Sequence, residues 1–310
     1  MRLAESARGI VSRNPTVTRF AVSLYGRGHG FTVQSADGRI SVTDPKGKRR
    51  VVLNAQHAVY ARDVIDDFDF YFEAVEPALV DAFLTVDYSA PREHRVQGWD
   101  LMPIEFPSLA EPLVTARQYL DFADLRLGQT AIDLGAYSGF TSLLFQEAVG
   151  GSGRVVAVEA DTLNLVSLRK NIDNFQKRTG TAPVVAELAV WSHNRGIEFL
   201  VEGNMGSAAA SLMKRGKKRV RQVPSSTLSD LCQRFELDDV HFIKADIEGA
   251  ELEAFSDREF FRDRHPKIIF EAAASKDHEP KAVIALLEQF GYTCRIRDQV
   301  GSRMPLVECL

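Results

Sequence analysis

The chain has 310 residues, of which 45% are hydrophobic and 26% charged, and this balance excludes a disordered or low-complexity protein. Its formal net charge of −4 argues against a dedicated nucleic-acid-binding protein, because such proteins usually carry a basic face large enough to shift the whole balance. A chain of this length can bury one large core or two modest ones.

The first 25 residues predict a short amphipathic helix, because arginines recur between small and apolar residues at Arg2, Arg8, Arg13 and Arg19. The segment lacks the continuous apolar stretch of a signal peptide or a membrane span, so we expect neither. The helix either packs on the chain's own core or touches a membrane surface or a partner.

Short antiparallel strands are expected between residues 30 and 54. Apolar positions alternate there and are interrupted by Asp37-Gly38 and by Asp44-Pro45 with Gly47, which are typical of tight turns. We therefore predict a β-rich N-terminal extension over residues 1–110. Its aromatic run, FDFYFEAV, either packs in a core or forms a lid or a sugar-stacking surface through Phe68, Phe70, Tyr71 and Phe72.

From residue 111 onward, apolar strands alternate with helix-length segments, which predicts a second domain over residues 111–310. The strand runs are TAIDLG, RVVAVEA, PVVAELAV, HFIKADI and KIIFEAAA. Such strands are buried on both faces, so they predict a doubly wound, Rossmann-like α/β sheet of parallel strands covered by helices. Too few residues join YTCRIRD to RMPLVECL for a helical crossover, so we expect an antiparallel pair there.

The run AIDLGAYSGF ends the first of these strands and begins the next helix. In a doubly wound sheet this is the crevice where ligands bind, and Gly135 and Gly139 let the backbone approach a ligand closely. The pattern differs from the G-x-G-x-x-G turn of nicotinamide enzymes. Asp133 would repel a pyrophosphate but suits a ligand with an ammonium group or hydroxyls, and S-adenosylmethionine has both.

The next strand ends in Glu159, where a carboxylate can accept hydrogen bonds from both hydroxyls of a ribose. Asp161 follows at the expected N-cap of the next helix. Together with the glycine turn, these acids indicate an S-adenosylmethionine site. We expect it to be lined by Asp133, Gly135, Ala136, Tyr137, Ser138, Gly139, Glu159, Ala160, Asp161, Ala189 and Asp246.

These segments, with STLSDL and IKADIEGAELEAF, resemble the FkbM family of S-adenosylmethionine-dependent methyltransferases over roughly residues 112–310. The run IKADIEGAELEAF is the most specific, since it is close to the family's Lys-Ile-Asp-Val-Glu-Gly-Ala-Glu signature. The resemblance implies a seven-stranded sheet that ends in a reversed hairpin. It also implies methyl transfer to a hydroxyl of a sugar, a lipid-linked glycan or a secondary metabolite. The run AVWS departs from the family, because it places Ser192 where relatives often have an acid.

Methyl transfer requires the acceptor oxygen to lie in line with an already activated methyl group, and it requires help in removing the hydroxyl proton. Asp246, at the end of HFIKADI, is the first candidate for a general base or an acceptor-positioning group. Glu271 ends the fifth strand at the same rim, and His278 lies in the loop beyond it, with a pKa suited to taking a proton at neutral pH. These three residues are the catalytic candidates.

Other charged residues surround these candidates. Glu248 is either reactive or structural, Glu251 is expected to cap a helix, and Lys244 is expected to pair with a neighbouring carboxylate. Asp246, Glu248, Glu271 and Asp277 are oxygen ligands of the kind that Mg²⁺ takes, but the resemblance does not imply a metal and we expect none.

The run MKRGKKRVR, residues 213–221, predicts a hairpin inserted between the third and fourth strands. It is either a solvated tip or a basic surface that attracts an anionic acceptor. The three cysteines, Cys232, Cys294 and Cys309, are odd in number and far apart in the sequence. They predict neither a disulfide framework nor a metal knuckle, and they fit a reducing cytoplasm.

We therefore expect a cytoplasmic O-methyltransferase whose N-terminal extension shapes or closes the acceptor site. The expected partner is a small-molecule or glycan acceptor, anionic or neutral. Nucleic acid and a transmembrane segment are not expected, and a homodimer is left open. The alternatives are a methyltransferase that acts on nitrogen or on a macromolecule, and a non-catalytic module that keeps the cofactor pocket for partner contacts.

Overall fold

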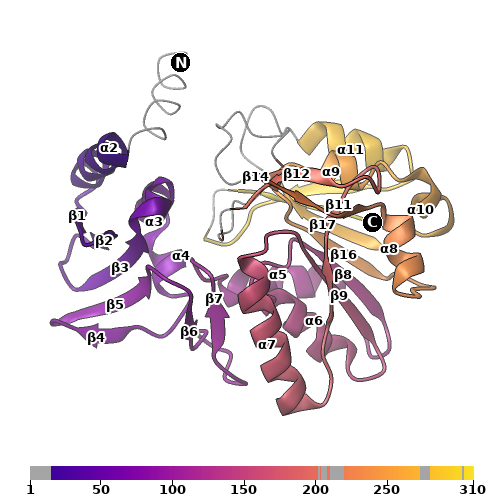
Figure 1. Cartoon of the computed structure of the whole chain (residues 1–310), viewed down its shortest axis with the longest axis horizontal. Helices are drawn as coiled ribbons and strands as arrows, with labels where there is room; N and C mark the ends of the chain where they lie inside the picture. The colour runs from indigo at the N-terminus through magenta and orange to yellow at the C-terminus, as the bar shows by residue number, and fades with distance from the viewer. Residues whose placement is uncertain (1–14, 202, 204–207, 210–219, 273–279, 302–303) are drawn as a thin grey trace. The chain divides into compact units, whose positions relative to one another are not determined.

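The computed structural model (Figure 1) describes residues 15–201, 203, 208–209, 220–272, 280–301 and 304–310. Contacts within the chain group it into two compact units, Met1–Leu113 and Val114–Leu310. Each unit has its own sheet and its own buried apolar residues, so each has the means to form a core.

The N-terminal unit contains a five-stranded sheet with the order β1-β2-β3-β5-β4. Neighbouring strands are antiparallel except for β3 and β5. Asp37 and Gly38, between β1 and β2, have φ angles of 48° and 72°, as the predicted Asp-Gly hairpin turn requires. The predicted antiparallel strands are confirmed. Their bounds are β1 Thr32–Ala36, β2 Arg39–Thr43, β3 Arg49–Asn54, β4 Ala78–Val80 and β5 Phe83–Tyr88.

Helix α2 (Pro15–Gly28) contains the second part of the predicted N-terminal helix, whereas Arg2, Arg8 and Arg13 lie outside the described residues. Its Val22 is buried, whereas Phe20 and Leu24 are exposed. Among the described helices, none has both the length and the apolar character needed to cross a bilayer. The unit is completed by η1 Ala55–Tyr60, α3 Ala61–Asp66, α4 Phe68–Phe72, and the paired strands β6 Arg92–His94 and β7 Ile104–Phe106.

The aromatic run of this unit contributes to its core through helix α4. Phe68 and Phe72 are buried and stack with 5.6 Å between their ring centroids. The guanidinium of Arg49 lies 5.3 Å from the centroid of each ring, a distance typical of cation–π contact. Of the two interpretations of this run, core packing therefore describes Phe68 and Phe72.

The C-terminal unit contains a seven-stranded sheet with the order β10-β9-β8-β16-β17-β19-β18. Its pairs are parallel except those made by β19, which is antiparallel to both of its neighbours. The predicted doubly wound sheet and its reversed C-terminal strand are confirmed. The bounds are β8 Thr130–Leu134, β9 Arg154–Glu159, β10 Val184–Glu187, β16 Phe242–Ala245, β17 Lys267–Glu271, β18 Cys294–Arg297 and β19 Leu306–Cys309.

Helices cover both faces of this sheet (Figure 1). Ala131 and Ile132 are neighbours on β8 but belong to different apolar clusters, because successive strand residues point to opposite faces. One cluster includes residues of α5 and α6, and the other includes residues of α8, α10 and α11. The helices are α5 Leu113–Ala123, α6 Phe140–Val149, α7 Asn164–Thr179, α8 Leu228–Arg234, α9 Glu251–Ala254, α10 Arg258–Asp263 and α11 Pro280–Glu288.

A small antiparallel sheet, here called the inserted sheet, lies in the chain between β10 and β16. It consists of β12 (Ile197–Leu200), β13 (Ala208–Ala209) and β14 (Val220–Val223), in the order β13-β12-β14. It is flanked by the short parallel pair β11 (Ala189–Val190) and β15 (Ser225–Ser226). Most of the basic run, residues 213–219, falls outside the described residues, whereas Arg221 lies on β14 and is exposed.

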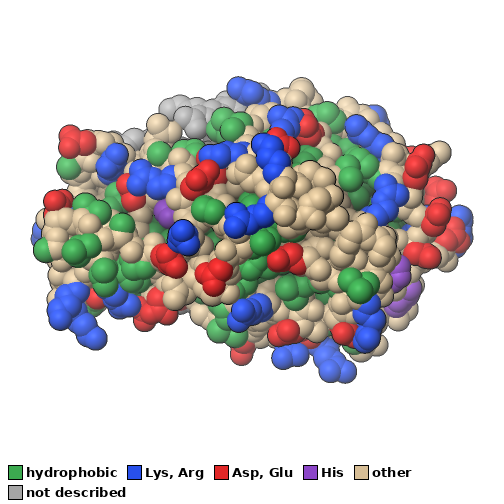
Figure 2. All heavy atoms as spheres, turned by 90° about the horizontal axis from the view of Figure 1, so that it is seen from below, with side chains coloured by type: hydrophobic (Ala, Val, Ile, Leu, Met, Phe, Trp, Pro, Cys, Tyr) green, Lys and Arg blue, Asp and Glu red, His purple; other side chains and the backbone are tan. Residues whose placement is uncertain are grey.

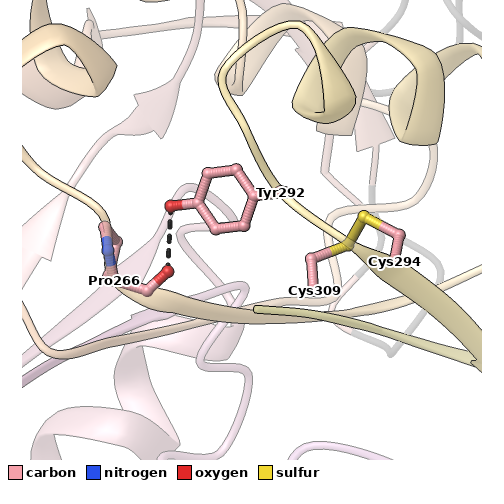
Figure 3. The surroundings of a disulfide bond; sticks show 4 residues. All are labelled: Pro266, Tyr292, Cys294 and Cys309. Atoms are coloured by element: carbon pink, nitrogen blue, oxygen red, sulfur yellow. Dashed lines mark hydrogen bonds between the residues drawn. A yellow bond between two sulfur atoms is a disulfide. The ribbon is translucent and has the colours of Figure 1, made fainter.

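The hairpin of β18 and β19 carries a disulfide between Cys294 and Cys309 (Figure 3). The prediction that no disulfide is available was therefore wrong. The cysteines are 15 residues apart in the sequence, but the antiparallel register places them directly opposite each other. The cysteine count consequently supports no argument for a reducing compartment. Next to the disulfide, the Tyr292 hydroxyl donates a hydrogen bond to the Pro266 carbonyl (Figure 3).

We predict that reduction of this disulfide lowers the free energy of unfolding by about 3 kcal/mol, the chain-entropy value for a loop of this length. Urea unfolding with and without a thiol reductant measures the difference. Cys294→Ser should match the reduced protein and should no longer respond to reductant. Equal unfolding midpoints for oxidised and reduced protein would contradict the prediction.

Candidate functional site

The predicted site lies at the carboxyl ends of β8, β9, β16 and β17. Strand β8 has β9 on one side and β16 on the other, so the order of the sheet reverses beside it. In open α/β sheets, ligands bind outside the carboxyl ends of the strands at such a point.

The turn after β8 has room only for small residues at its start. Gly135 has a φ of 78°, and a Cβ placed there would lie 1.9 Å from the carbonyl oxygen of Asp246. The N–H groups of Gly135 and Ala136 both donate to the carbonyl of Val158, so the turn is also tied to β9. Tyr137 has a φ of 50°, which is unusual for a non-glycine residue. The backbone of β8 therefore touches both neighbouring strand ends.

Asp133 does not face an open crevice but forms a buried ion pair under this turn. Its Oδ1 lies 3.0 Å from Lys244 Nζ in an ion-pair contact that is not aligned as a hydrogen bond, and both side chains are almost fully buried. Ser142 donates to Oδ2 at 2.5 Å, and Lys244 also donates to the Gly135 carbonyl at 2.8 Å. Asp133 therefore stabilises the turn after β8 through Lys244 and Ser142.

Glu159 is buried beside the same turn and accepts hydrogen bonds from the backbone. Its Oε2 accepts from Tyr137 N at 2.8 Å, and its Oε1 accepts from Asp161 N at 2.7 Å. Burial raises the pKa of this carboxyl to about 7, and the backbone donors oppose that shift. The carboxylate has more lone pairs than backbone donors, so it can accept a further hydrogen bond.

Asp161 is fully buried, and its carboxylate holds two backbone segments. Oδ1 accepts from Leu163 N and Oδ2 accepts from Gly203 N, each at 2.7 Å. The N-cap of α7 is Leu163, so the prediction that Asp161 is the N-cap was wrong. Asp161 instead holds the turn that leads into α7 and the segment after β12. Ala160 packs in an apolar cluster with residues of the inserted sheet, whereas Ala189 lies on β11 and pairs with Ser225.

Asp246 and Glu271 come together from the ends of adjacent parallel strands. Burial raises the pKa of Glu271 well above its ordinary range, and the negative charges of Asp246 and Glu248 and a hydrogen bond with Asp246 raise it further. Lys244 opposes this shift. The surroundings therefore favour the protonated form of Glu271.

Glu251 stabilises the loop that follows Asp246. Its Oε1 accepts from Ile247 N and Gly249 N, each at 3.4 Å, and burial raises its pKa to about 7. Glu248 in this loop has a φ of 54°, a conformation that costs energy for a non-glycine residue. Among the described residues, no group of three or more His, Cys, Asp or Glu side chains is arranged to hold a metal ion.

Two predicted residues, His278 and Asp277, lie outside the described residues. Ser192 donates to the carboxylate of Glu253 on α9. Ser142 and Gly203, which contact the two buried aspartates, were not predicted from the sequence. Ser142 follows the glycine turn in the first helical turn of α6 and could have been suspected from that position, whereas nothing in the sequence marks Gly203.

The family profile described as the methyltransferase FkbM domain matches residues 133–294, which is more than half of the chain. The matched region begins at Asp133 and contains the glycine turn, Glu159, Asp161, Asp246 and Glu271. No curated protein matches the chain in sequence.

Three solved structures illustrate the similarity. The methyltransferase FkbM from Methylobacillus flagellatus KT is 18% identical, with 62% of this chain and 50% of that chain covered and a TM-score of 0.42. The match thus spans half of that protein's length. The O-methyltransferase from Bacillus cereus in complex with SAH is 13% identical, with 64% of this chain and 81% of that chain covered and a TM-score of 0.40. Aeropyrum pernix fibrillarin with natively bound S-adenosyl-L-methionine is 12% identical, with 90% of this chain and 98% of that chain covered and a TM-score of 0.40.

We predict that Lys244→Met lowers the free energy of unfolding by about 3–5 kcal/mol, because it leaves the buried charge of Asp133 without its cation. The double variant Asp133→Asn/Lys244→Met removes both charges and should lose clearly less than the sum of the two single variants. Urea unfolding followed by circular dichroism measures all three. Strictly additive losses would show that the two charges do not interact.

Proposed function

The chain belongs to the FkbM family of S-adenosylmethionine-dependent methyltransferases, and from this premise we propose that it methylates a hydroxyl group of a sugar, a lipid-linked saccharide or a secondary metabolite. One observation carries the proposal. The Glu159 carboxylate beside the glycine turn and the interacting carboxyl groups of Asp246 and Glu271 stand at the same edge of one sheet. The group that we propose for cofactor binding and the group that we propose as proton acceptor therefore lie at one edge.

The acid beside the turn fits the cofactor. Beyond its backbone donors, the Glu159 carboxylate keeps the capacity to accept a hydrogen bond from a ribose hydroxyl. S-adenosylmethionine supplies an activated methyl group on a sulfonium, so the protein need not activate it. Its own tasks are to orient the acceptor oxygen and to take the proton of that oxygen.

We assign proton removal to Asp246 and its support to Glu271. The raised pKa of Glu271 favours its protonated form, in which it can donate a hydrogen bond to Asp246. Asp246 can then present an oxygen to the hydroxyl of the substrate. The negative charge of Glu248 beside the pair raises the pKa of Glu271 further.

The charge of the described site favours an uncharged, hydroxyl-bearing acceptor over an anionic one. Asp246, Glu248 and Glu271 are carboxylic acids, and the ammonium of Lys244 is held by Asp133 and the Gly135 carbonyl. Such a rim attracts hydrogen-bond donors and repels anions. On the face shown in Figure 2, basic and acidic side chains alternate, and the described residues form no continuous basic surface there.

Incubation with labelled S-adenosylmethionine and fractionated cell extract tests the proposal most directly. Label that enters an uncharged polyhydroxylated fraction, and that is lost on treatment with an O-demethylating reagent, supports it. Label confined to protein, RNA or amines would replace it with the nitrogen or macromolecule alternative. No transfer into any fraction, despite cofactor binding, would favour a non-catalytic module.

We predict that cofactor affinity rises as the pH increases through about 7. Glu159 ionises in that range, and the carboxylate accepts hydrogen bonds from hydroxyls more strongly than the acid does. Glu159→Gln should weaken binding by about 1.5–3 kcal/mol above this pH and abolish the pH dependence. Isothermal titration calorimetry with S-adenosylhomocysteine at several pH values measures both effects.

Glu187→Gln provides a matched control for that measurement. Glu187 lies directly opposite Glu159 at the end of the neighbouring strand β10, but it is exposed and pairs with Arg169. Its replacement should leave the affinity and its pH dependence unchanged. If Glu159→Gln binds like the wild type at every pH, the carboxylate does not contact the cofactor.

We predict that Asp246→Asn lowers kcat by about 10²- to 10⁴-fold, the usual contribution of a general base. Glu271→Gln should cost much less, because an amide replaces the protonated acid as a hydrogen-bond donor to Asp246. Initial rates with the accepting fraction and saturating cofactor compare the two. A larger loss for Glu271→Gln than for Asp246→Asn would reverse the two assignments.

A further inference from the structure

The inserted sheet packs against two parts of the site that are far apart in the sequence. Phe199, Val201 and Val223 form an apolar cluster with Ala160, which lies between Glu159 and Asp161. On the other side, Ala209 of β13 clusters with Trp191 and Ala250. Ala250 ends the loop that begins at Asp246 and contains Glu248. The inserted sheet therefore connects the cofactor side of the site with the acceptor side.

One polar contact joins this sheet to the cofactor side. The N–H of Gly203, three residues after the end of β12, donates to Oδ2 of Asp161 at 2.7 Å. The backbone of Asp161 in turn donates to Glu159, which accepts from Tyr137 in the glycine turn. A continuous series of hydrogen bonds thus leads from the turn after β8 to the inserted sheet.

Glycine is required at position 203 by the backbone conformation and by the close approach of Leu163. Gly203 has a φ of 65°, which disfavours other residues, and a Cβ there would lie 2.9 Å from Cβ of Leu163. Leu163 N is the second donor to Asp161. The two backbone segments thus approach each other closely because they share one carboxylate. Asp161 is itself fully buried, and both of its carboxylate oxygens accept hydrogen bonds from backbone N–H groups.

We propose that Asp161 is a positioning residue that fixes the inserted sheet to the cofactor side of the site and so couples occupancy of that side to the loop of Asp246. The coupling runs through Glu159 and Asp161 to Gly203, and then through the apolar contacts of the inserted sheet with Ala250. The tie between Asp161 and the sheet is independent of the proposed function, whereas its effect on methyl transfer depends on it.

Hydrogen exchange on the full chain tests whether Asp161 holds the inserted sheet in place. Asp161→Asn keeps an oxygen for Leu163 N but can turn its amide N–H₂ toward Gly203 N, which removes that hydrogen bond. Backbone amides of Ile197–Val201 and Val220–Val223 should then exchange about 10- to 100-fold faster, the change expected for loss of a hydrogen bond to a charged group. Wild-type exchange rates in these two segments would overturn the proposal.

Exchange with and without S-adenosylhomocysteine tests the coupling. In the wild type, the added ligand should slow exchange in the same two segments, and this protection should be lost in Asp161→Asn. Weaker ligand binding with unchanged exchange of the inserted sheet would instead assign Asp161 a direct ligand contact and overturn the proposal. If the wild type does not bind S-adenosylhomocysteine, the proposed function fails. The exchange rates without ligand still show whether Asp161 holds the inserted sheet.

Two further variants keep the result interpretable. Asp257→Asn is the matched control, because Asp257 caps α10 through Glu259 N and Phe260 N and also accepts from Ser229 N, so it bridges two segments as Asp161 does. It should leave exchange of the inserted sheet unchanged, and faster exchange there would show a global effect. Gly203→Ala keeps the N–H donor, but its Cβ would clash with Leu163 and displace the donor from Asp161, so it should reproduce the Asp161→Asn result. Its failure to do so would count against the proposal.

Discussion

The ion pair between Asp133 and Lys244 joins two neighbouring strands at the point where the order of the sheet reverses. Both side chains are buried, so each charge depends on the other for its stability in the interior. The ammonium also holds the Gly135 carbonyl, and the backbone of Gly135 lies against the carbonyl of Asp246. One contact therefore fixes both the start of the cofactor turn and the start of the acidic loop.

Around this joint, buried carboxyl groups of one chemical type serve different purposes because their neighbours differ. Glu159 and Glu251 accept hydrogen bonds from backbone N–H groups, which organise loops around them. Glu271 instead faces other carboxyl groups and is driven to hold a proton. Burial raises the pKa of all three, so the identity of the neighbours, and not burial alone, distinguishes Glu271 from the two acids that hold backbone N–H groups.

Much of the fold could be predicted because its signals are local. Continuous apolar runs marked the strands of the large sheet, and the short connection before RMPLVECL required its reversed strand. The register of strands β18 and β19 could not be predicted from such local signals. Cys294 and Cys309 looked distant in the sequence, yet the register of the hairpin places them opposite each other. The position of the candidate site followed from the glycine turn and the acids at the strand ends, since ligands of doubly wound sheets bind there.

The sequence by itself determined the order of strands and helices, the glycines that the first turn requires, and the family to which the chain belongs. Only the tertiary structure decided the partner of each acid. Asp133 was expected to face a ligand but lies against Lys244, and Asp161 was expected to cap a helix but instead holds two backbone segments. The physical reason is that apolar periodicity and turn chemistry act between neighbours along the chain. The partner of a buried carboxylate depends instead on which distant segments the packing of the sheet brings within hydrogen-bond distance.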